Sequence, residues 1–214
     1  MIDLIISGIT PPLLVVFFIY RNDLYETEPH DLLVKTFFLG LLITIPMILF
    51  EIGTQALIKN MFLFSLFGVA LVEEGIKYLV LIYYNFPKKD FNEPYDGIIY
   101  SVVLTMGFAL VENLMYIIGS DSGHDVSTLI MLTAIPMHAT CGIVMGYFLG
   151  KAKMEEKGKK LNLIISLLVP VLIHGLYNYF IFIGVFGFSL IILIAAVVYS
   201  LKAIKIHQKN SPFK

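Results

Sequence analysis

The sequence predicts an all-α fold, a polytopic transmembrane helical bundle of about seven spans. Of the 214 residues, 58% are hydrophobic and only 14% are charged, and the mean hydropathy is +0.85. Soluble domains average about 25% charged residues, so the lipid bilayer must be the solvent of this chain. Apolar stretches of the roughly 20 residues needed to cross about 30 Å of hydrocarbon recur along the sequence.

Seven such stretches follow one another with short connections. No positive charge precedes the first, and no A-x-A-like cleavage site follows it, so we expect an uncleaved span. Pro46, Pro136 and Pro170 fall inside later spans, where neighbouring helices are expected to tolerate a kink. Only residues 182–185 separate the last two spans. The predicted spans are residues 4–20, 32–57, 61–84, 97–118, 128–150, 161–181 and 186–201.

The basic residues predict how the bundle is oriented, because cytoplasmic loops carry an excess of lysine and arginine. With seven spans, thirteen of the fifteen basic residues fall on one side of the membrane. Lys59 falls on the other side, and Lys77 lies within the third span. We therefore expect the N-terminus outside and the C-terminus in the cytoplasm. The thirteen are Arg21, Lys35, Lys88, Lys89, Lys151, Lys153, Lys157, Lys159, Lys160, Lys202, Lys205, Lys209 and Lys214.

Composition also excludes several classes of function. The net charge is −1, and the basic residues are dispersed among short loops, so nucleic-acid binding is not expected. Cys141 is the single cysteine and lies in an apolar run, which rules out a disulfide framework or a cysteine-rich metal motif. The sequence shows no internal repeat and no soluble domain, so residues 1–214 are predicted to form one integral membrane domain.

Six ionisable residues lie well inside the predicted spans and carry most of the functional information. A charged side chain at the centre of a bilayer costs about 2.5 to 3.5 kcal/mol on insertion scales, so these residues must meet partners. Glu51, nearer a span end, can reach the interface. The six are Glu73, Glu74, Lys77, Glu112, His138 and His174.

Helical spacing predicts which of these side chains share a face. Lys77 follows Glu73 by four residues and Glu74 by three, so its ammonium can pair with either carboxylate. His174 and Asn178 are four residues apart and also share a face. At a rise of 1.5 Å per residue, the ionisable residues come out roughly 9 to 18 Å below the outer ends of their spans, and Asn178 about 5 Å below. Four helices are thus expected to bring them into one cavity open to the outer side.

The chemistry of this set allows two interpretations. Glu73, Glu74, Glu112 and Lys77 sum to −2 when ionised, which one divalent cation would cancel, and two histidines with a glutamate match a catalytic zinc site. Protonation of two glutamates would neutralise the cluster equally well.

At these residues the chain resembles the PrsW family of bacterial intramembrane proteases, within the wider group of CAAX-processing and bacteriocin-immunity-type proteases. The resemblance covers essentially the whole chain. In the CAAX-type pattern a more distant Arg usually replaces Lys77, and His often replaces Glu112, so roles transfer more safely from PrsW itself. The matching motifs are Gly8-Ile9-Thr10-Pro11, Glu73-Glu74-x-x-Lys77, Tyr95-Asp96-Gly97, Gly107-Phe108 to Glu112-Asn113, Gly146 to Ala152 and His174-Gly175.

The resemblance implies a multi-pass protease of the bacterial cell membrane. Its expected substrate is a single-pass transmembrane anti-sigma factor, cut at site 1 on the extracytoplasmic side to start sigma-factor activation. It also implies either a metalloprotease or a glutamate-activated water without metal.

Two mechanisms follow as hypotheses. In the first, Glu73 or Glu74 is the general base, tuned by Lys77, while Glu112, His138 and His174 hold one Zn²⁺ and Asn178 stabilises the oxyanion. In the second, which is metal-free, Glu73 works with Glu112 or His138 on the water, and His174 with Asn178 donates to the oxyanion.

Two rival functions belong to other classes. A proton- or cation-coupled transporter would also use buried acids and histidines. The odd number of spans, the lack of a repeat and the clustering of charge near one face argue against it. A non-catalytic receptor would leave the cost of four buried charges unexplained.

Overall fold

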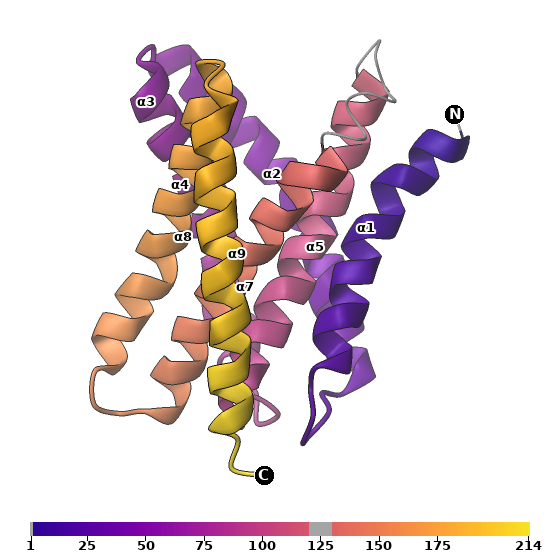
Figure 1. The fold of residues 1–214 in the computed structure, drawn as a ribbon, viewed down its shortest axis with the longest axis vertical. Helices are drawn as coiled ribbons and strands as arrows, with labels where there is room; N and C mark the ends of the chain where they lie inside the picture. Colours follow the sequence, from indigo (N-terminus) through magenta and orange to yellow (C-terminus); the bar gives the residue numbers. More distant parts are fainter. Residues whose placement is uncertain (1, 120–129) are drawn as a thin grey trace.

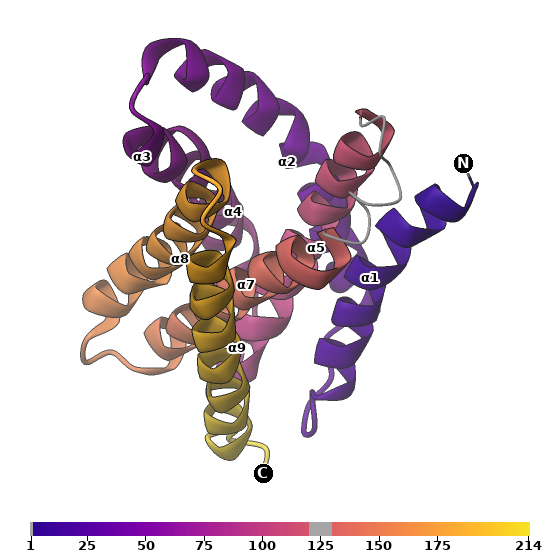
Figure 2. The same ribbon diagram turned by 45° about the horizontal axis from the view of Figure 1, so that its top comes forward.

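The computed structural model describes residues 2–119 and 130–214, and the regular elements within these ranges are all helical (Figure 1). Helix α2 runs obliquely from the end occupied by α3 towards α5 (Figure 2). Short π-helical stretches interrupt the α-helices. In chain order the elements are α1 (Ile2–Arg21), α2 (His30–Leu57), α3 (Met61–Leu63), η1 (Phe64–Ala70), α4 (Leu71–Val80), η2 (Leu81–Asn85), α5 (Pro94–Gly119), η3 (Ile130–Ala134), α7 (Ile135–Met154), α8 (Lys159–Phe182) and α9 (Phe186–Lys209).

Five helical segments in the described ranges are long and apolar enough to cross a membrane: α2, α5, α8, α9 and residues Leu132–Met154, which include α7. In α1 the apolar helix Ile5–Arg21 is shorter. Long apolar side chains such as Leu49 and Leu57, 66% and 82% exposed, face outward and have no protein to cover them. These features confirm an all-α, multi-pass membrane protein.

Several predicted boundaries change. The third predicted span, residues 61–84, is a run of α3, η1, α4 and η2 rather than one regular α-helix, with π-helical turns on both sides of α4. Helix α9 continues to Lys209, past the predicted end at Leu201, because a helix with a basic end can extend from the bilayer into water. The predicted start of the fifth span, Thr128, lies outside the described residues.

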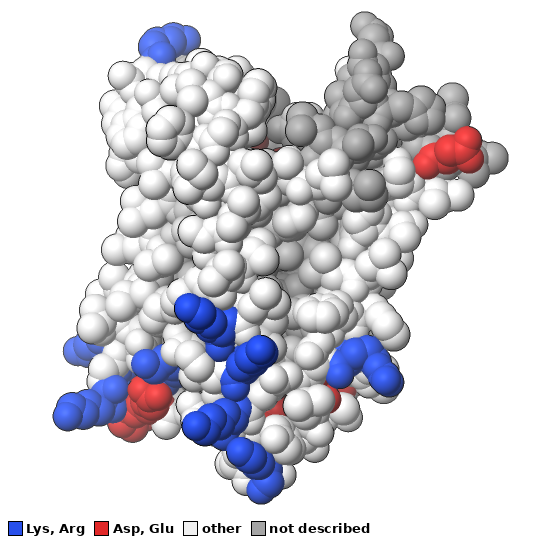
Figure 3. Space-filling view, in the orientation of Figure 1, with Lys and Arg blue, Asp and Glu red and all other residues white. Residues whose placement is uncertain are grey.

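The basic side chains gather at the end of the bundle where the C-terminus lies (Figure 3). The last turns of α1, α7 and α9 and the first turn of α8 meet at this end, with Arg21, Lys151, Lys159 and Lys209 among them. Lys59 lies in the turn before α3, at the opposite end. The two ends of the bundle therefore differ in charge in the way that the sequence predicts.

Helices α5 and α7 form the buried centre of the bundle, and glycines let their backbones meet. A Cβ atom on Gly146 would lie 2.2 Å from the carbonyl oxygen of Gly97, and one on Gly97 would lie 2.3 Å from the carbonyl oxygen of Gly146. Neither oxygen can move without displacing its helix. Small residues at such crossings allow the close backbone approach on which helix packing in membranes depends.

We expect Gly146→Ala to destabilise the protein by about 1–3 kcal/mol, the usual cost of overpacking. Gly53→Ala is the matched control, because a Cβ there meets nothing within 4 Å and alanine favours the helix. Thermal unfolding in detergent measures both variants. Equal midpoints for Gly146→Ala and wild type would contradict the close contact.

Candidate active site

The site begins on α4, where two adjacent glutamates and a lysine one turn later place two carboxylates around one cation. Lys77 Nζ donates hydrogen bonds to Glu73 Oε2 at 3.0 Å and to Glu74 Oε1 at 2.9 Å. All three side chains are buried, with Lys77 and Glu74 fully so. The ring of Phe108, from α5, lies 4.1 Å from the ammonium. The predicted i, i+3 and i, i+4 pairing is confirmed, and it offsets part of the cost of burying these charges.

Helix α8 brings His174 against the same two carboxylates. Its Nδ1 lies 3.0 Å from Glu74 Oε1, and its Nε2 lies 3.9 Å from Glu73 Oε1. Glu74 accepts from Lys77 as an ionised carboxylate, so the imidazole nitrogen beside it carries the proton and donates. Gly175 permits this approach, because a Cβ there would lie 2.5 Å from a Leu66 side-chain atom on η1. The other ring nitrogen, Nε2, faces Glu73.

A second carboxylate–imidazole pair joins α5 to α7. His138 Nε2 lies 2.8 Å from Glu112 Oε2, and the His138 ring packs edge-on against His174 with 5.3 Å between ring centroids. Phe108 also packs edge-on against His138, with centroids 5.6 Å apart. His138 Nδ1 is buried and has no hydrogen-bond partner among the described residues. One nitrogen of each histidine therefore lies within 3.0 Å of a carboxylate oxygen. The other nitrogen has no such short contact: His138 Nδ1 is unpartnered among the described residues, and His174 Nε2 lies 3.9 Å from Glu73 Oε1.

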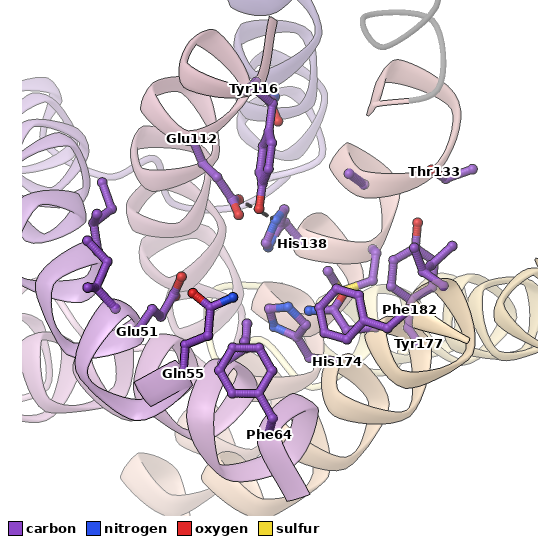
Figure 4. A pocket seen from close by; sticks show the side chains of 18 residues that line it. Glu51, Gln55, Phe64, Glu112, Tyr116, Thr133, His138, His174, Tyr177 and Phe182 are labelled. Atoms are coloured by element: carbon purple, nitrogen blue, oxygen red, sulfur yellow. Dashed lines mark ion pairs between the residues drawn. The ribbon is translucent and has the colours of Figure 1, made fainter. Parts of the chain in front are cut away.

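These groups adjoin a cavity of about 500 Å³ (Figure 4). Its lining includes residues from the end of α2, from η1 and from the end of α8, which lie at the end of the bundle away from the C-terminus (Figure 1). Glu112, His138, His174 and Asn178 line the cavity. Glu51 on α2 faces the histidines across the cavity, and its carboxyl lies close enough to Glu73 to share a hydrogen bond when one of the two is protonated. The remaining lining is largely apolar, so an extended apolar segment fits the space better than a soluble ion does.

Four residues can offer ligand atoms that all lie within 4.8 Å of one another: Glu73, Glu74, His138 and His174. Nitrogen and carboxylate oxygen ligands suit zinc, and catalytic zinc sites use three protein ligands and leave one position open. The unpartnered Nδ1 of His138 fits this role, as does Nε2 of His174, which lies 3.9 Å from Glu73 Oε1. The residues present therefore fit a zinc ion, with carboxylates behind both imidazoles as metal-binding histidines commonly have.

The structure brings together all the residues that the sequence singled out, in a different grouping. Glu112 lies beside His138 and outside the group of four, whereas Glu73 and Glu74 belong to it. Asn178 lies on the cavity wall, one turn beyond His174. Two residues near the site were not predicted to belong to it. Glu51 was expected to reach the membrane interface. Phe108 lies one helical turn before Glu112, and this spacing indicates that both side chains lie on the same face of α5.

Comparison with known proteins agrees with this geometry. The family described as PrsW family intramembrane metalloprotease matches residues 28–202, which include every residue of the site. The chain belongs to the PrsW family. It is thus a membrane-embedded endopeptidase of a bacterial cell membrane, and the transporter and receptor alternatives are set aside.

Relatives in this family match over most of their length. Protease PrsW of Oceanobacillus iheyensis is 37% identical over 194 residues, covering 90% of this chain and 88% of the relative. Protease PrsW of Clostridioides difficile is 36% identical, covering 92% and 86%, and that of Bacillus subtilis is 32% identical, covering 84% and 83%. No solved structure matches the chain significantly.

Proposed function

We propose that this PrsW-family protease makes the site-1 cut in a single-pass transmembrane anti-sigma factor. In this proposal the chain crosses the membrane seven times, with its N-terminus outside and its C-terminus in the cytoplasm. The observation that carries it is the cavity: Glu112, His138, His174 and Asn178 line an apolar space at the end of the bundle away from the basic loops. A cut there would fall on the extracytoplasmic side of a membrane-spanning substrate.

The group of four supports a division of roles that differs from the sequence-based hypothesis. Glu73, His138 and His174 would hold the metal, while Glu74 and Glu112 accept hydrogen bonds from the opposite nitrogens of the two imidazoles. When bound, zinc supplies a Lewis acid that polarises the scissile carbonyl and makes water more acidic. Lys77 holds one oxygen of Glu73 and one of Glu74, which keeps both carboxylates ionised and oriented.

The remaining residues perform the proton and oxyanion chemistry. Glu112 lines the cavity and its side chain is 20% exposed, so it can reach a water placed beside the substrate and take its proton. Asn178 is half-buried on the same wall and has an amide N–H₂ to donate to the developing oxyanion. In the metal-free alternative, Glu73 and Glu112 would share the water, and His174 would donate beside Asn178.

The test is cleavage of a single-pass anti-sigma substrate by the purified protein, with and without a chelator. We expect cleavage on the extracytoplasmic side, about one zinc per chain, and loss of both zinc and cleavage in His174→Ala. Metal-free protein that still cleaves would favour the glutamate mechanism. Cleavage of other membrane segments but not of the anti-sigma factor would overturn the substrate assignment and leave the protease intact.

A further inference from the structure

A second acidic cluster lies at the other end of the bundle, where α1 ends, α2 begins and α5 starts (Figure 1). Glu26 and Glu28 come from the connection between α1 and α2, and Asp96 from the first turn of α5. Each offers a carboxylate oxygen, and these oxygens all lie within 4.8 Å of one another. About seventy residues of chain separate Glu28 from Asp96, so the fold itself gathers the three carboxylates.

In two of these carboxylates, one oxygen accepts hydrogen bonds and the other accepts none from the described residues. Tyr100 Oη donates to Glu28 Oε2, and the backbone N–H groups of Asn92 and Glu93 each donate to Asp96 Oδ2 at 2.7 Å. The other oxygens, Glu28 Oε1 and Asp96 Oδ1, are buried without a hydrogen-bond partner in the described ranges. Glu28 is 1% exposed and Asp96 is 0% exposed. Buried acceptors without donors are costly and require an explanation, and here both belong to a set of converging ligand atoms.

The surrounding charges increase the demand for a cation. Asp23 and Glu93, also buried, face the cluster and add two more carboxyls. Lys153 of α7 interacts with Asp96, but its ammonium is bound to the carbonyl oxygens of Phe86 and Lys88, at 2.5 and 3.4 Å. A single ammonium, which is also bound to two backbone carbonyls, is too little positive charge to neutralise a group of five acids.

We propose that Glu26, Glu28 and Asp96 bind a hard divalent cation, Mg²⁺ or Ca²⁺, that fastens the α1–α2 connection to the start of α5. All the ligand atoms are oxygens, which these ions prefer and which do not favour zinc over them. The site lies at the end of the bundle opposite the protease cavity, so the cation is structural. It joins α1 and α2, which flank the buried helix α5, at a place where two other bonds already meet: Tyr95 Oη to Ile19 O and Gln208 Nε2 to Asn22 O.

The experiment uses full-length protein in detergent, stripped with a chelator and then titrated with MgCl₂ or CaCl₂ by calorimetry. We expect one site per chain and a higher unfolding midpoint with the ion. The affinity for the cation should fall at least about tenfold in Glu26→Gln and in Glu28→Gln. Mutation of residues that only hydrogen-bond to metal ligands already lowers metal affinity by about 10–100-fold, and a direct ligand should matter at least as much. Glu26→Gln removes a half-buried ligand with little risk to folding.

Two controls separate this site from other acidic groups. Asp31→Asn changes an exposed carboxylate in the first turn of α2 that is paired with Lys35, and it should leave cation affinity unchanged. His174→Ala removes a ligand of the protease site and should still be stabilised by Mg²⁺ or Ca²⁺. Absence of binding in wild type, unaltered affinity in Glu26→Gln, or loss of the stabilisation in His174→Ala would each overturn the proposal.

Discussion

Glu73→Gln is expected to reduce cleavage of a membrane-embedded substrate by roughly 10³-fold, in the range that general acid–base and metal-site residues supply. Glutamine preserves the length and shape of the side chain but removes the negative charge. In the structure one carboxylate oxygen accepts from Lys77 and the other faces His174 Nε2 at 3.9 Å. An amide nitrogen in place of either oxygen would repel the ammonium or block the ligand position. Single-turnover cleavage in proteoliposomes measures the effect.

The matched control for this loss is Glu51→Gln. Glu51 lines the cavity and carries the same functional group, but it is outside the group of four that can ligate a metal. We expect it to keep most of the wild-type rate and the wild-type zinc content. If Glu73→Gln cleaves normally, or if Glu51→Gln loses activity and zinc as severely, the division of roles between these acids is wrong.

Much of the fold follows from apolar runs and basic loops alone. Each predicted span corresponds to a helical stretch, because only helices satisfy their own backbone hydrogen bonds in lipid and each needs about 20 apolar residues. The π-helical stretches beside α4 could not be predicted, since they do not alter the apolar pattern. The difference in positive charge between the two ends of the bundle could be predicted because lysine and arginine are costly to carry across the membrane.

The site was predictable in its membership but not in its pairing. Glu73, Glu74, Lys77 and His174 stand out because ionisable residues inside spans are rare. Their partners depend on how each helix is rotated about its axis. The contact of Glu112 with His138 and the position of Glu51 opposite His174 therefore could not be predicted from the sequence. The acidic cluster at Glu28 was not visible, because acidic residues in a loop are ordinarily solvated.

Lys77→Met is expected to destabilise the protein by about 3–5 kcal/mol, the usual cost of removing one partner from a buried ion pair. Methionine fills similar space and keeps contact with Phe108, so the loss arises from charge and not from a cavity. Glu73 and Glu74 are both buried, at 1% and 0% exposure, and Lys77 is the cation bonded to them. Without it they must take up protons or draw the helices apart. Thermal or denaturant unfolding in detergent measures the change.

Two further variants show that the effect belongs to the buried triad. Lys35→Met removes an exposed lysine paired with Asp31 at 2.8 Å and should leave the unfolding midpoint unchanged, because solvent screens that pair. Glu74→Gln combined with Lys77→Met leaves one buried carboxylate in place of two, so it should recover part of the stability lost in Lys77→Met. It should not recover cleavage, because the remaining carboxylate lacks the ammonium that keeps it ionised and oriented beside His174. A double variant as unstable as Lys77→Met would mean that the lysine stabilises the bundle through the contact of its ammonium with the Phe108 ring, and that the two carboxylates are neutral before it is removed.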